Sequence, residues 1–361
     1  MGLHNKSFGR ERNLLTQGDA ELAQIIFRLL RNATSQQVVR DFLKSLGIAT
    51  SAQNWDDLFT RRIQPALNEG LLTISDFRSL LQQVEECGRQ HTFLFKCDAD
   101  SAHTLLSRAR VTRIASEEGL GDLLTDPLDL ELPDEPTIVD IRLTPHDGAR
   151  HLSELMIKVV ETRTTKVFVG ETWDRVAGTM TKQYVLHHKR AVNVAVLRDT
   201  GVLELRIASQ DNQSKYHDNL RVFRAAIARF IPQNGFAAVL LSRAKTKLWN
   251  DQESLAGEIR YSHSSARNDF GFVMNVSSSS QADNISTDDG SKAAMQSFLD
   301  SEGHVTAANV YVKIPDTDRE IHLLLSGEPN EFAIPVACSA EDYAYVRDKI
   351  LSFNRASSAR S

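Results

Sequence analysis

The chain has 361 residues, 41% of them hydrophobic and 25% charged, and a net charge of −5. These are ordinary values for globular protein, and the length suits two or three domains. No stretch approaches the ~18 consecutive apolar residues of a membrane span, and the polar N-terminal residues lack the apolar core of a signal peptide. The three cysteines form no CxxC pair, so we expect a reduced, cytoplasmic protein without membrane contact.

Residues 1–97 predict an N-terminal helical bundle. Apolar side chains recur at helical spacing in four stretches, at 18–32, 32–47, 51–70 and 73–88. Asp19 is a candidate cap for the first helix, and Pro65 is expected to kink or break the third.

The seam between this bundle and the rest of the chain reads EECGRQHTFLFKC, from Glu85 to Cys97. Gly88 is placed to end a helix in the left-handed conformation, and Thr92 to Cys97 predict a strand after a short corner. Cys87, His91 and Cys97 do not have a recognised zinc spacing, so we interpret the stretch as a structural junction.

A short helix at 101–113 and an acidic linker are predicted for residues 98–136. Residues 116–136 contain eight carboxylates, three prolines and no basic residue, which is typical of a solvated linker. Such a segment could also fold back on a basic surface, so masking of that surface by residues 117–135 stays an open hypothesis.

The pattern then changes from helical spacing towards alternation, and residues 137–235 predict an α+β domain. We expect a helix at 214–231 and successive strands at 137–144, 153–163, 165–173, 182–190, 191–199 and 201–209. The turn residues Asp199 to Gly201 predict a hairpin. Such strands in series favour antiparallel pairing.

Residues 236–355 repeat this scheme as a second α+β region, and residues 356–361 predict a disordered tail. Strands are expected at 257–265, 270–279, 304–315 and 320–336, with helices at 291–303 and 340–353. The fold class expected for the whole chain is α+β: an N-terminal helical bundle followed by mixed, mainly antiparallel sheet with packed helices.

No motif for nucleotide, metal or covalent catalysis occurs in the chain, so we expect no enzyme activity, no cofactor and no metal. The one enzymatic alternative is a metal-dependent nuclease that would use Asp134, Asp140 and Lys158. The closely spaced acidic residue and lysine that such a site needs on one strand are missing.

The middle third of the chain is basic, because residues 161–247 hold 15 lysines and arginines against 7 acidic residues. Clustered cations of this kind can follow a phosphate backbone. The candidate nucleic-acid-binding residues are Arg61, Arg62, Lys182, Lys189, Arg190, Lys215, Arg221 and Arg224. A solvated face that balances the acidic segments is the simpler interpretation of the same charges.

The order of elements resembles the centromere protein N family, with a helical bundle ending in TISDFRSLLQQVEECGRQHTFLF, then KQYVLHHKRAVNVAVL and VLELRIASQDNQSKYHDNLRVFRAAIARF. The resemblance covers about residues 19–231. It implies a death-fold-like domain over Asp19–Cys97, an α+β domain over Ile138–Ile231, and a non-catalytic DNA-holding groove between them. The acidic linker and the acidic last third depart from a simple DNA clamp.

The sequence therefore predicts a non-enzymatic adaptor that binds double-stranded DNA or a nucleoprotein, nucleoid-associated in a bacterium and nuclear in a eukaryote. A protein–protein subunit whose basic patch faces an acidic partner is the alternative. The oligomeric state and the role of residues 236–361 are not predicted.

Overall fold

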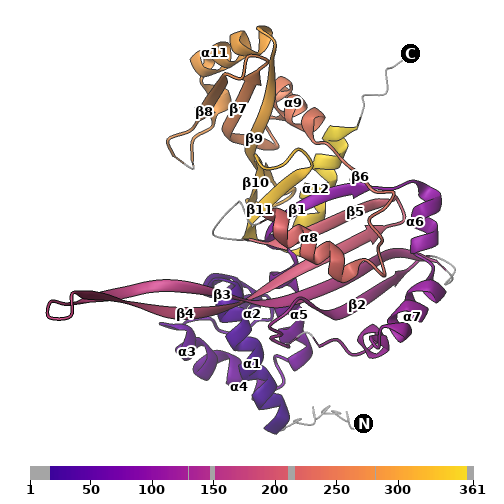
Figure 1. Ribbon diagram of the computed structural model, residues 1–361, viewed down its shortest axis with the longest axis vertical. Coiled ribbons are helices and arrows are strands. Elements are labelled where there is room, and N and C mark those ends of the chain that lie inside the picture. The colour runs from indigo at the N-terminus through magenta and orange to yellow at the C-terminus, as the bar shows by residue number, and fades with distance from the viewer. Residues whose placement is uncertain (1–16, 129, 147–150, 210–215, 281, 356–361) are drawn as a thin grey trace, which may run out of the picture. The chain divides into compact units, whose positions relative to one another are not determined.

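The computed structural model describes residues 17–128, 130–146, 151–209, 216–280 and 282–355 (Figure 1). The chain divides into two compact units, Met1–Glu85 and Glu86–Ser361. The fold is α+β, as predicted: helices form the N-terminal unit, and an antiparallel sheet with packed helices forms the second. The tail predicted at 356–361 lies outside the described residues.

The N-terminal unit contains the helical segments α1 (Gln17–Ala33), α2 (Gln36–Ser45), α3 (Trp55–Leu58), η1 (Phe59–Ile63), α4 (Gln64–Asn68) and α5 (Ile74–Glu86). Phe27 of α1 packs against two rings of the third predicted helix. Its ring centroid lies 5.6 Å from that of Trp55 and 4.7 Å from that of Phe59. The amphipathic pattern thus brings α1 and α3–η1 together through aromatic contacts.

The predicted kink at Pro65 takes the form of a π-helical turn, η1, between α3 and α4. Proline has no N–H to donate to the carbonyl four residues earlier, and its ring crowds that carbonyl. The helix widens over Phe59–Ile63 and resumes with Pro65 in the first turn of α4. Such a bulge lets the chain continue in one direction where a regular helix would break.

The second unit is built on one antiparallel sheet with the strand order β2-β3-β4-β5-β1-β11-β10-β9-β7-β8, and β6 pairs with the end of β1. The two predicted α+β regions, 137–235 and 236–355, therefore share a sheet. The strands are β1 (Gly88–Lys96), β2 (Thr137–Pro145), β3 (Leu152–Asp174), β4 (Thr179–Arg198), β5 (Val202–Ala208), β6 (Ala237–Ala238), β7 (Ile259–Asn268), β8 (Val273–Ser277), β9 (Gly303–Lys313), β10 (Glu320–Leu325) and β11 (Glu331–Ala337).

Strand β1 joins the two halves of this sheet, because it pairs with β5 on one side and β11 on the other. Its alternation places Phe93 and Phe95 in one apolar core and Leu94 in a second core. The predicted domain boundary at residue 97 was wrong for this reason: β1 belongs to the sheet, and the first unit ends at Glu85.

Helices cover the two cores separately. The first core includes residues of α6 (Ala99–Leu105), α7 (Arg108–Glu117), η2 (Gly121–Leu124) and α8 (Tyr216–Ile227), and the second includes residues of α9 (Ser242–Asn250), η4 (Ile285–Thr287) and α12 (Ala340–Asn354). Two further helices, α10 (Gln252–Leu255) and α11 (Asp289–Asp300), complete the described elements. The single helix predicted at 101–113 is a pair, α6 and α7, separated at Ser107.

Gly88 has a φ of +82°, as its predicted left-handed conformation requires. A Cβ atom at this position would lie 1.9 Å from the carbonyl oxygen of Val336 on β11. The predicted corner at Arg89–His91 was wrong, because these residues already belong to β1. His91 contacts Glu331 through its Nδ1 and stacks on Tyr216, with the ring centroids 4.1 Å apart.

Cys87, Cys97 and Cys338 are all free and buried. Burial raises the pKa of the Cys87 thiol to about 11 and that of the Cys338 thiol to about 12. At neutral pH both are therefore protonated, apolar side chains of the second unit.

A buried group of charges, here called the Glu204 cluster, ties β4, β5 and α12 together. Its members are Glu204, Arg198, Arg206, Tyr343 and Arg347. The Glu204 carboxylate has no exposed surface and accepts hydrogen bonds from Arg206 (2.8 and 3.0 Å), Tyr343 (3.0 Å), Arg347 (3.4 Å) and Arg198. The Arg206 guanidinium also lies 4.0 Å from the centre of the Tyr343 ring.

The arginines determine the charge state of this carboxylate. Burial alone would raise the pKa of Glu204, but Arg206, Arg198 and Arg347 outweigh it and lower the pKa from 4.5 to about 2. Because the folded-state pKa lies below the unfolded one, the cluster stabilises the fold above pH 4.5, and this contribution is lost as pH falls towards 2.

Replacement of Gly88 by alanine is expected to lower the free energy of unfolding by more than about 2 kcal/mol, because strain at positive φ adds to the collision with Val336. Urea denaturation measures this change. Gly235→Ala is the matched control, because Gly235 has a φ of +92° but no atom within 4 Å of the added Cβ. Equal losses in the two variants would contradict the role of the close approach.

Replacement of Glu204 by glutamine is expected to cost about 3–5 kcal/mol at pH 7, because it leaves buried arginines without their counter-charge. The difference from the unmodified protein should narrow as pH falls below 4.5. Glu154→Gln is the control: Glu154 pairs with Arg198 nearer the surface, so its loss should cost about 1 kcal/mol or less. A pH-independent difference for Glu204→Gln would refute the charge assignment.

Candidate nucleic-acid interface

Strands β3 and β4 continue beyond the sheet as a two-stranded ribbon, visible in Figure 1 as the long hairpin. Pairing of β2 with β3 reaches only Val160, and the β4–β5 ladder reaches only Val194. From Thr162 to Arg190 the two strands pair with each other alone. We call residues 162–190 the arm.

The sequence predicted four short strands here, at 153–163, 165–173, 182–190 and 191–199, and this division was wrong. The structure has two long strands, Leu152–Asp174 and Thr179–Arg198. The alternation of side chains continues through Thr164–Thr165 and through Arg190–Ala191, and neither pair contains a turn residue. The sequence therefore gives no physical reason for a strand to end at either position.

Cross-strand register divides the arm into two faces, because residues that pair directly point to the same side of a ribbon. A β-bulge between Phe168 and Gly170 adds one residue, Val169, to β3. One face, here called the lysine–aromatic face, carries the pairs Trp173–Met180, Glu171–Lys182, Phe168–Tyr184, Lys166–Leu186 and Thr164–His188. The opposite face carries Thr172–Thr181, Gly170–Gln183, Val167–Val185, Thr165–His187 and Arg163–Lys189.

Large apolar side chains are exposed along the lysine–aromatic face. Trp173 is 58% exposed and Tyr184 51% exposed, and Met180 and Leu186 are similar. The Phe168 and Tyr184 rings meet edge to face, with centroids 5.9 Å apart and planes at 68°. A contiguous exposed apolar patch of this kind usually marks an interaction site, and a two-stranded ribbon is only marginally stable by itself.

The arm is also basic, with six lysines and arginines against two acidic residues between positions 162 and 190. Lys166 and Lys182 lie on the lysine–aromatic face, Lys189 on the opposite face and Arg175 at the tip. Among the described residues none of these four cations forms an ion pair. Their charges are therefore available to an external anion.

Lys182 and Lys189 both lie on the arm, but on its opposite faces. Arg190 lies at the base, where its Nη1 donates to the carbonyl oxygen of Glu131 at 2.5 Å. The arm thus contains three of the predicted binding residues, and the third is partly engaged.

The two predicted binding residues of α8, Arg221 and Arg224, differ in their exposure and contacts. Arg221 is exposed and lies 3.9 Å from the Asp218 carboxylate. Arg224 stacks over Phe95 at 4.4 Å and donates to Gln233 at 2.8 Å, and partial burial lowers its pKa. Arg224 therefore contributes to packing as well as to charge. Its replacement by an acidic residue would disturb the fold. Lys215, predicted beside them, lies outside the described residues.

Arg61 and Arg62 belong to the N-terminal unit, in the π-helical turn. Arg61 is exposed and pairs with Asp57 at 2.5 Å, and Arg62 donates to the Ser51 carbonyl at 2.8 Å and hydroxyl at 2.6 Å. Both guanidinium groups thus have local partners on the same unit.

Two further basic residues of the middle third already have partners within the second unit. Lys245 is buried in α9 and donates to the Thr306 carbonyl at 2.8 Å, and burial lowers its pKa. Lys247 pairs with Asp251 one turn along. Helix α9 itself was not predicted from the sequence; its buried apolar residues are Ala244, Leu248 and Trp249.

The acidic segment contacts some of the basic residues. Glu117 and Glu118 pair with Arg229 at 3.1 and 2.8 Å, and the Glu131 carbonyl accepts from Arg190. The lysines of the arm are nevertheless exposed. The described part of this segment therefore engages the base of the arm and the turn that follows α8, and leaves the arm itself open.

The residues of the nuclease alternative do not converge. Asp134 is exposed ahead of β2, whereas Asp140 and Lys158 are buried and face each other across β2 and β3. Asp140 pairs with Arg142 at 2.8 Å, and Lys158 pairs with Glu86 at 3.5 Å. These contacts favour a structural role for both buried residues.

Sequence reasoning missed Lys166, Trp173 and Arg175 as members of the site. The available signal was the turn sequence from Asp174 to Gly178. It is flanked by two runs of equal length in which apolar and polar residues alternate. It predicts a hairpin between 165–173 and 182–190, and this hairpin would have placed the missed residues beside Lys182.

Comparisons with models of known protein families and with curated protein sequences give no match to this chain. The resemblance to the centromere protein N family therefore stays a prediction. Within the described residues no helix is long and apolar enough to cross a membrane, and no three histidine, cysteine or acidic side chains are placed to hold a metal ion.

Removal of the arm is expected to leave the rest of the fold intact. In the test variant, a two-residue Asn-Gly turn replaces residues 164–188. This turn connects Arg163 to Lys189, and these two residues already pair in register. Because the removed side chains are exposed, the free energy of unfolding should change by less than about 1 kcal/mol. Val159→Ala, in the buried part of β3, is the control that should destabilise. A loss of several kcal/mol on removal of the arm would show that it packs against the protein.

Proposed function

We propose that the protein is a non-catalytic adaptor that binds double-stranded DNA, alone or within a nucleoprotein, through the arm. The observation that carries the proposal is the lysine–aromatic face, on which unpaired lysines alternate with exposed aromatic and apolar side chains along a free ribbon.

The shape of the arm supports a duplex as the partner. The major groove of B-DNA is about 12 Å wide and admits a two-stranded β-ribbon. A ribbon lying in a groove has phosphates on both sides, within reach of lysines on either face. Apolar side chains such as Met180 and Leu186 can contact thymine methyl groups or wedge between base steps.

The charge of the arm supports binding that depends on phosphates more than on sequence. Lys166, Arg175, Lys182 and Lys189 could each neutralise one phosphate. Four such contacts give a slope of about −3.6 for log Kobs against log salt concentration. The side chains that distinguish bases by paired hydrogen bonds, arginine, asparagine and glutamine, are scarce on the lysine–aromatic face. We therefore expect little sequence preference.

The resemblance to the centromere protein N family agrees with DNA as the partner but places the site elsewhere, in a groove between two domains. The arm lies wholly within the second unit. Arg61 and Arg62 belong to the N-terminal unit, so the arm site proposed here does not include them.

The double variant Lys166→Glu/Lys182→Glu is expected to weaken binding to a short random-sequence duplex by about 10- to 100-fold and to flatten the salt slope by about 2. Both residues are exposed on one face of the arm, so the fold should be unaffected. Fluorescence anisotropy at low and moderate salt measures both quantities.

The matched control is Arg267→Glu/Lys313→Glu, which makes the same change of charge at exposed positions of β7 and β9. It should retain both the affinity and the salt slope. Equal weakening in the two double variants would mean that overall charge, and not the arm, governs binding. Binding that survives removal of residues 164–188 would refute the proposal outright.

An acidic protein partner is the second candidate, and exposed apolar side chains on both faces favour it. Val167 and Val185 form an exposed pair on the opposite face, which a duplex groove would leave in water or against phosphates. If the full chain does not bind DNA at low salt, a protein that co-purifies with the full chain and not with the arm-deleted variant would support this candidate.

A further inference from the structure

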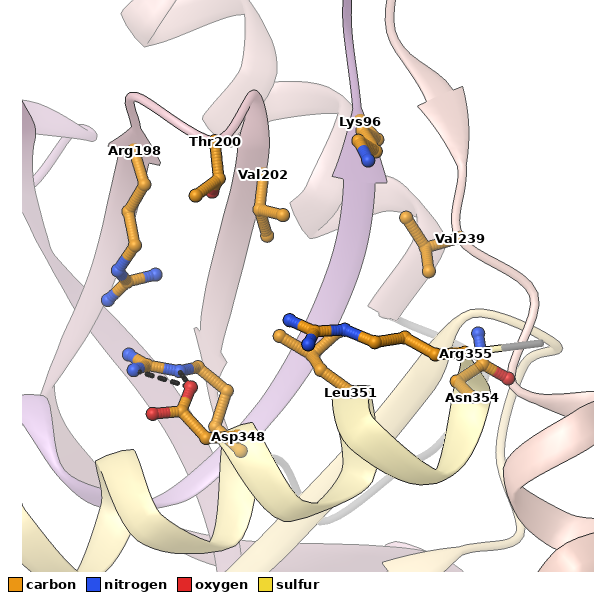
Figure 2. Close-up of a pocket in the computed structure, with 10 residues that line it drawn as sticks. Lys96, Arg198, Thr200, Val202, Val239, Asp348, Leu351, Asn354 and Arg355 are labelled. Carbon is orange, nitrogen blue, oxygen red and sulfur yellow. Dashed lines mark hydrogen bonds and ion pairs between the residues drawn. The ribbon is translucent and has the colours of Figure 1, made fainter. Parts of the chain in front are cut away.

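A second cationic feature lies at the other end of β4, where it turns into β5. A pocket with a volume of about 280 Å³ is lined by this turn, the end of β1, Val239 and the last turns of α12. Figure 2 shows its lining residues. The volume is close to the lower limit of about 300 Å³ for small-molecule sites. The described residues that form it come from four segments of the second unit, far apart in the sequence.

Four basic side chains and one acidic side chain line this pocket: Lys96, Arg198, Arg347, Arg355 and Asp348. Arg198 and Arg347 are held from behind by the buried Glu204 carboxylate, and Arg347 also pairs with Asp348 at 2.8 Å. The Glu204 cluster thus forms the rigid inner wall. The orientation of these two guanidinium groups is set before any ligand arrives, which lowers the entropic cost of binding.

The other two cations have no ion-pair partner among the described residues. Lys96 ends β1, and Arg355 follows α12. Figure 2 shows the Arg355 side chain reaching across the pocket from the end of α12, while Lys96 approaches from the opposite wall. Two unpaired cations that face one small cavity from two sides repel each other, and a bound anion would relieve that repulsion.

The rest of the lining consists of three aliphatic side chains together with the polar residues Thr200 and Asn354. Val202, Val239 and Leu351 contribute aliphatic surface between the two unpaired cations. A bare inorganic anion would leave this surface in contact with water, whereas an anion attached to an apolar or flat body would cover it.

We propose that this pocket binds a small organic phosphate monoester, with the phosphate between Lys96 and Arg355 and the apolar body against Val202, Val239 and Leu351. A phosphate dianion matches two free cations better than a carboxylate does, and guanidinium groups suit its geometry. The site is separate from the arm, so it is a ligand site additional to the proposed DNA-binding function and does not depend on it.

Calorimetric titration with phenyl phosphate, the simplest compound that joins an apolar ring to a phosphate, tests the proposal, and adenosine monophosphate is the second probe. We expect phenyl phosphate to bind more tightly than either phenol or inorganic phosphate. Lys96→Glu/Arg355→Glu should weaken its binding by at least about tenfold, because two charge-assisted contacts are lost.

Arg267→Glu/Lys313→Glu again supplies the charge-matched control and should bind phenyl phosphate like the unmodified protein. Failure of both probes to bind at millimolar concentration, or equal binding by the two double variants, would overturn the proposal. A 5′-phosphorylated oligonucleotide in competition separates two sources of the same group. Displacement of phenyl phosphate would assign the pocket to a strand end, and its absence would assign it to a free small molecule. Loss of DNA binding in arm variants would leave all these outcomes unchanged.

Discussion

One buried carboxylate, Glu204, carries much of the organisation of the second unit. Three arginines and a tyrosine from β4, β5 and α12 converge on it, and none of these elements can move without exposing a charge or breaking a hydrogen bond in a dry interior. Through Tyr343, which also contacts Thr92 at 2.9 Å, the same cluster reaches β1. The junction of the two half-sheets at β1 is therefore stabilised by polar contacts as well as by the two apolar cores. This gives a fixed base from which the arm leaves and against which the phosphate pocket forms.

The two proposed sites use positive charge in opposite ways. On the arm, lysines lie in high dielectric on a ribbon whose faces are both open, so each contact is weak, additive and strongly screened by salt. In the pocket, two of the cations are already anchored on a buried carboxylate and two others face a confined space. Such a site selects a ligand by its shape and by one anionic group, and it offers no surface for extended contact. A long polymer suits the first environment, and a small compact anion suits the second.

Most elements could be predicted from the sequence, because periodicity is local. The N-terminal helices, strands β7, β8 and β9 and the turn at Asp199–Gly201 follow from patterns within about 15 residues. The stretch 320–336, expected as one strand, forms two, β10 and β11. What could not be predicted depends on distant pairing. The membership of β1 in the sheet needs β5 and β11 on its two sides, and the strand length of the arm needs the register of β3 against β4. Of the predicted basic residues, Lys182 and Lys189 are exposed on the arm, whereas Arg224 packs against Phe95 in a way that charge counting does not reveal. The pocket, built from four remote segments, left no local signal.

The bulge at Val169 decides which residues share a face of the arm. Counted without the extra residue, Glu171 and Trp173 would turn to the side away from Phe168, and the aromatic row would be split between two faces. Evolution of the arm is constrained by this count. Lengthening both strands together by one facing pair keeps every cross-strand pair on a common face, whereas insertion or loss of a single residue in one strand turns the distal residues of that strand away from their partners. We therefore expect related chains to vary in arm length by matched pairs and to keep an odd residue in β3, even where the individual side chains of the arm differ.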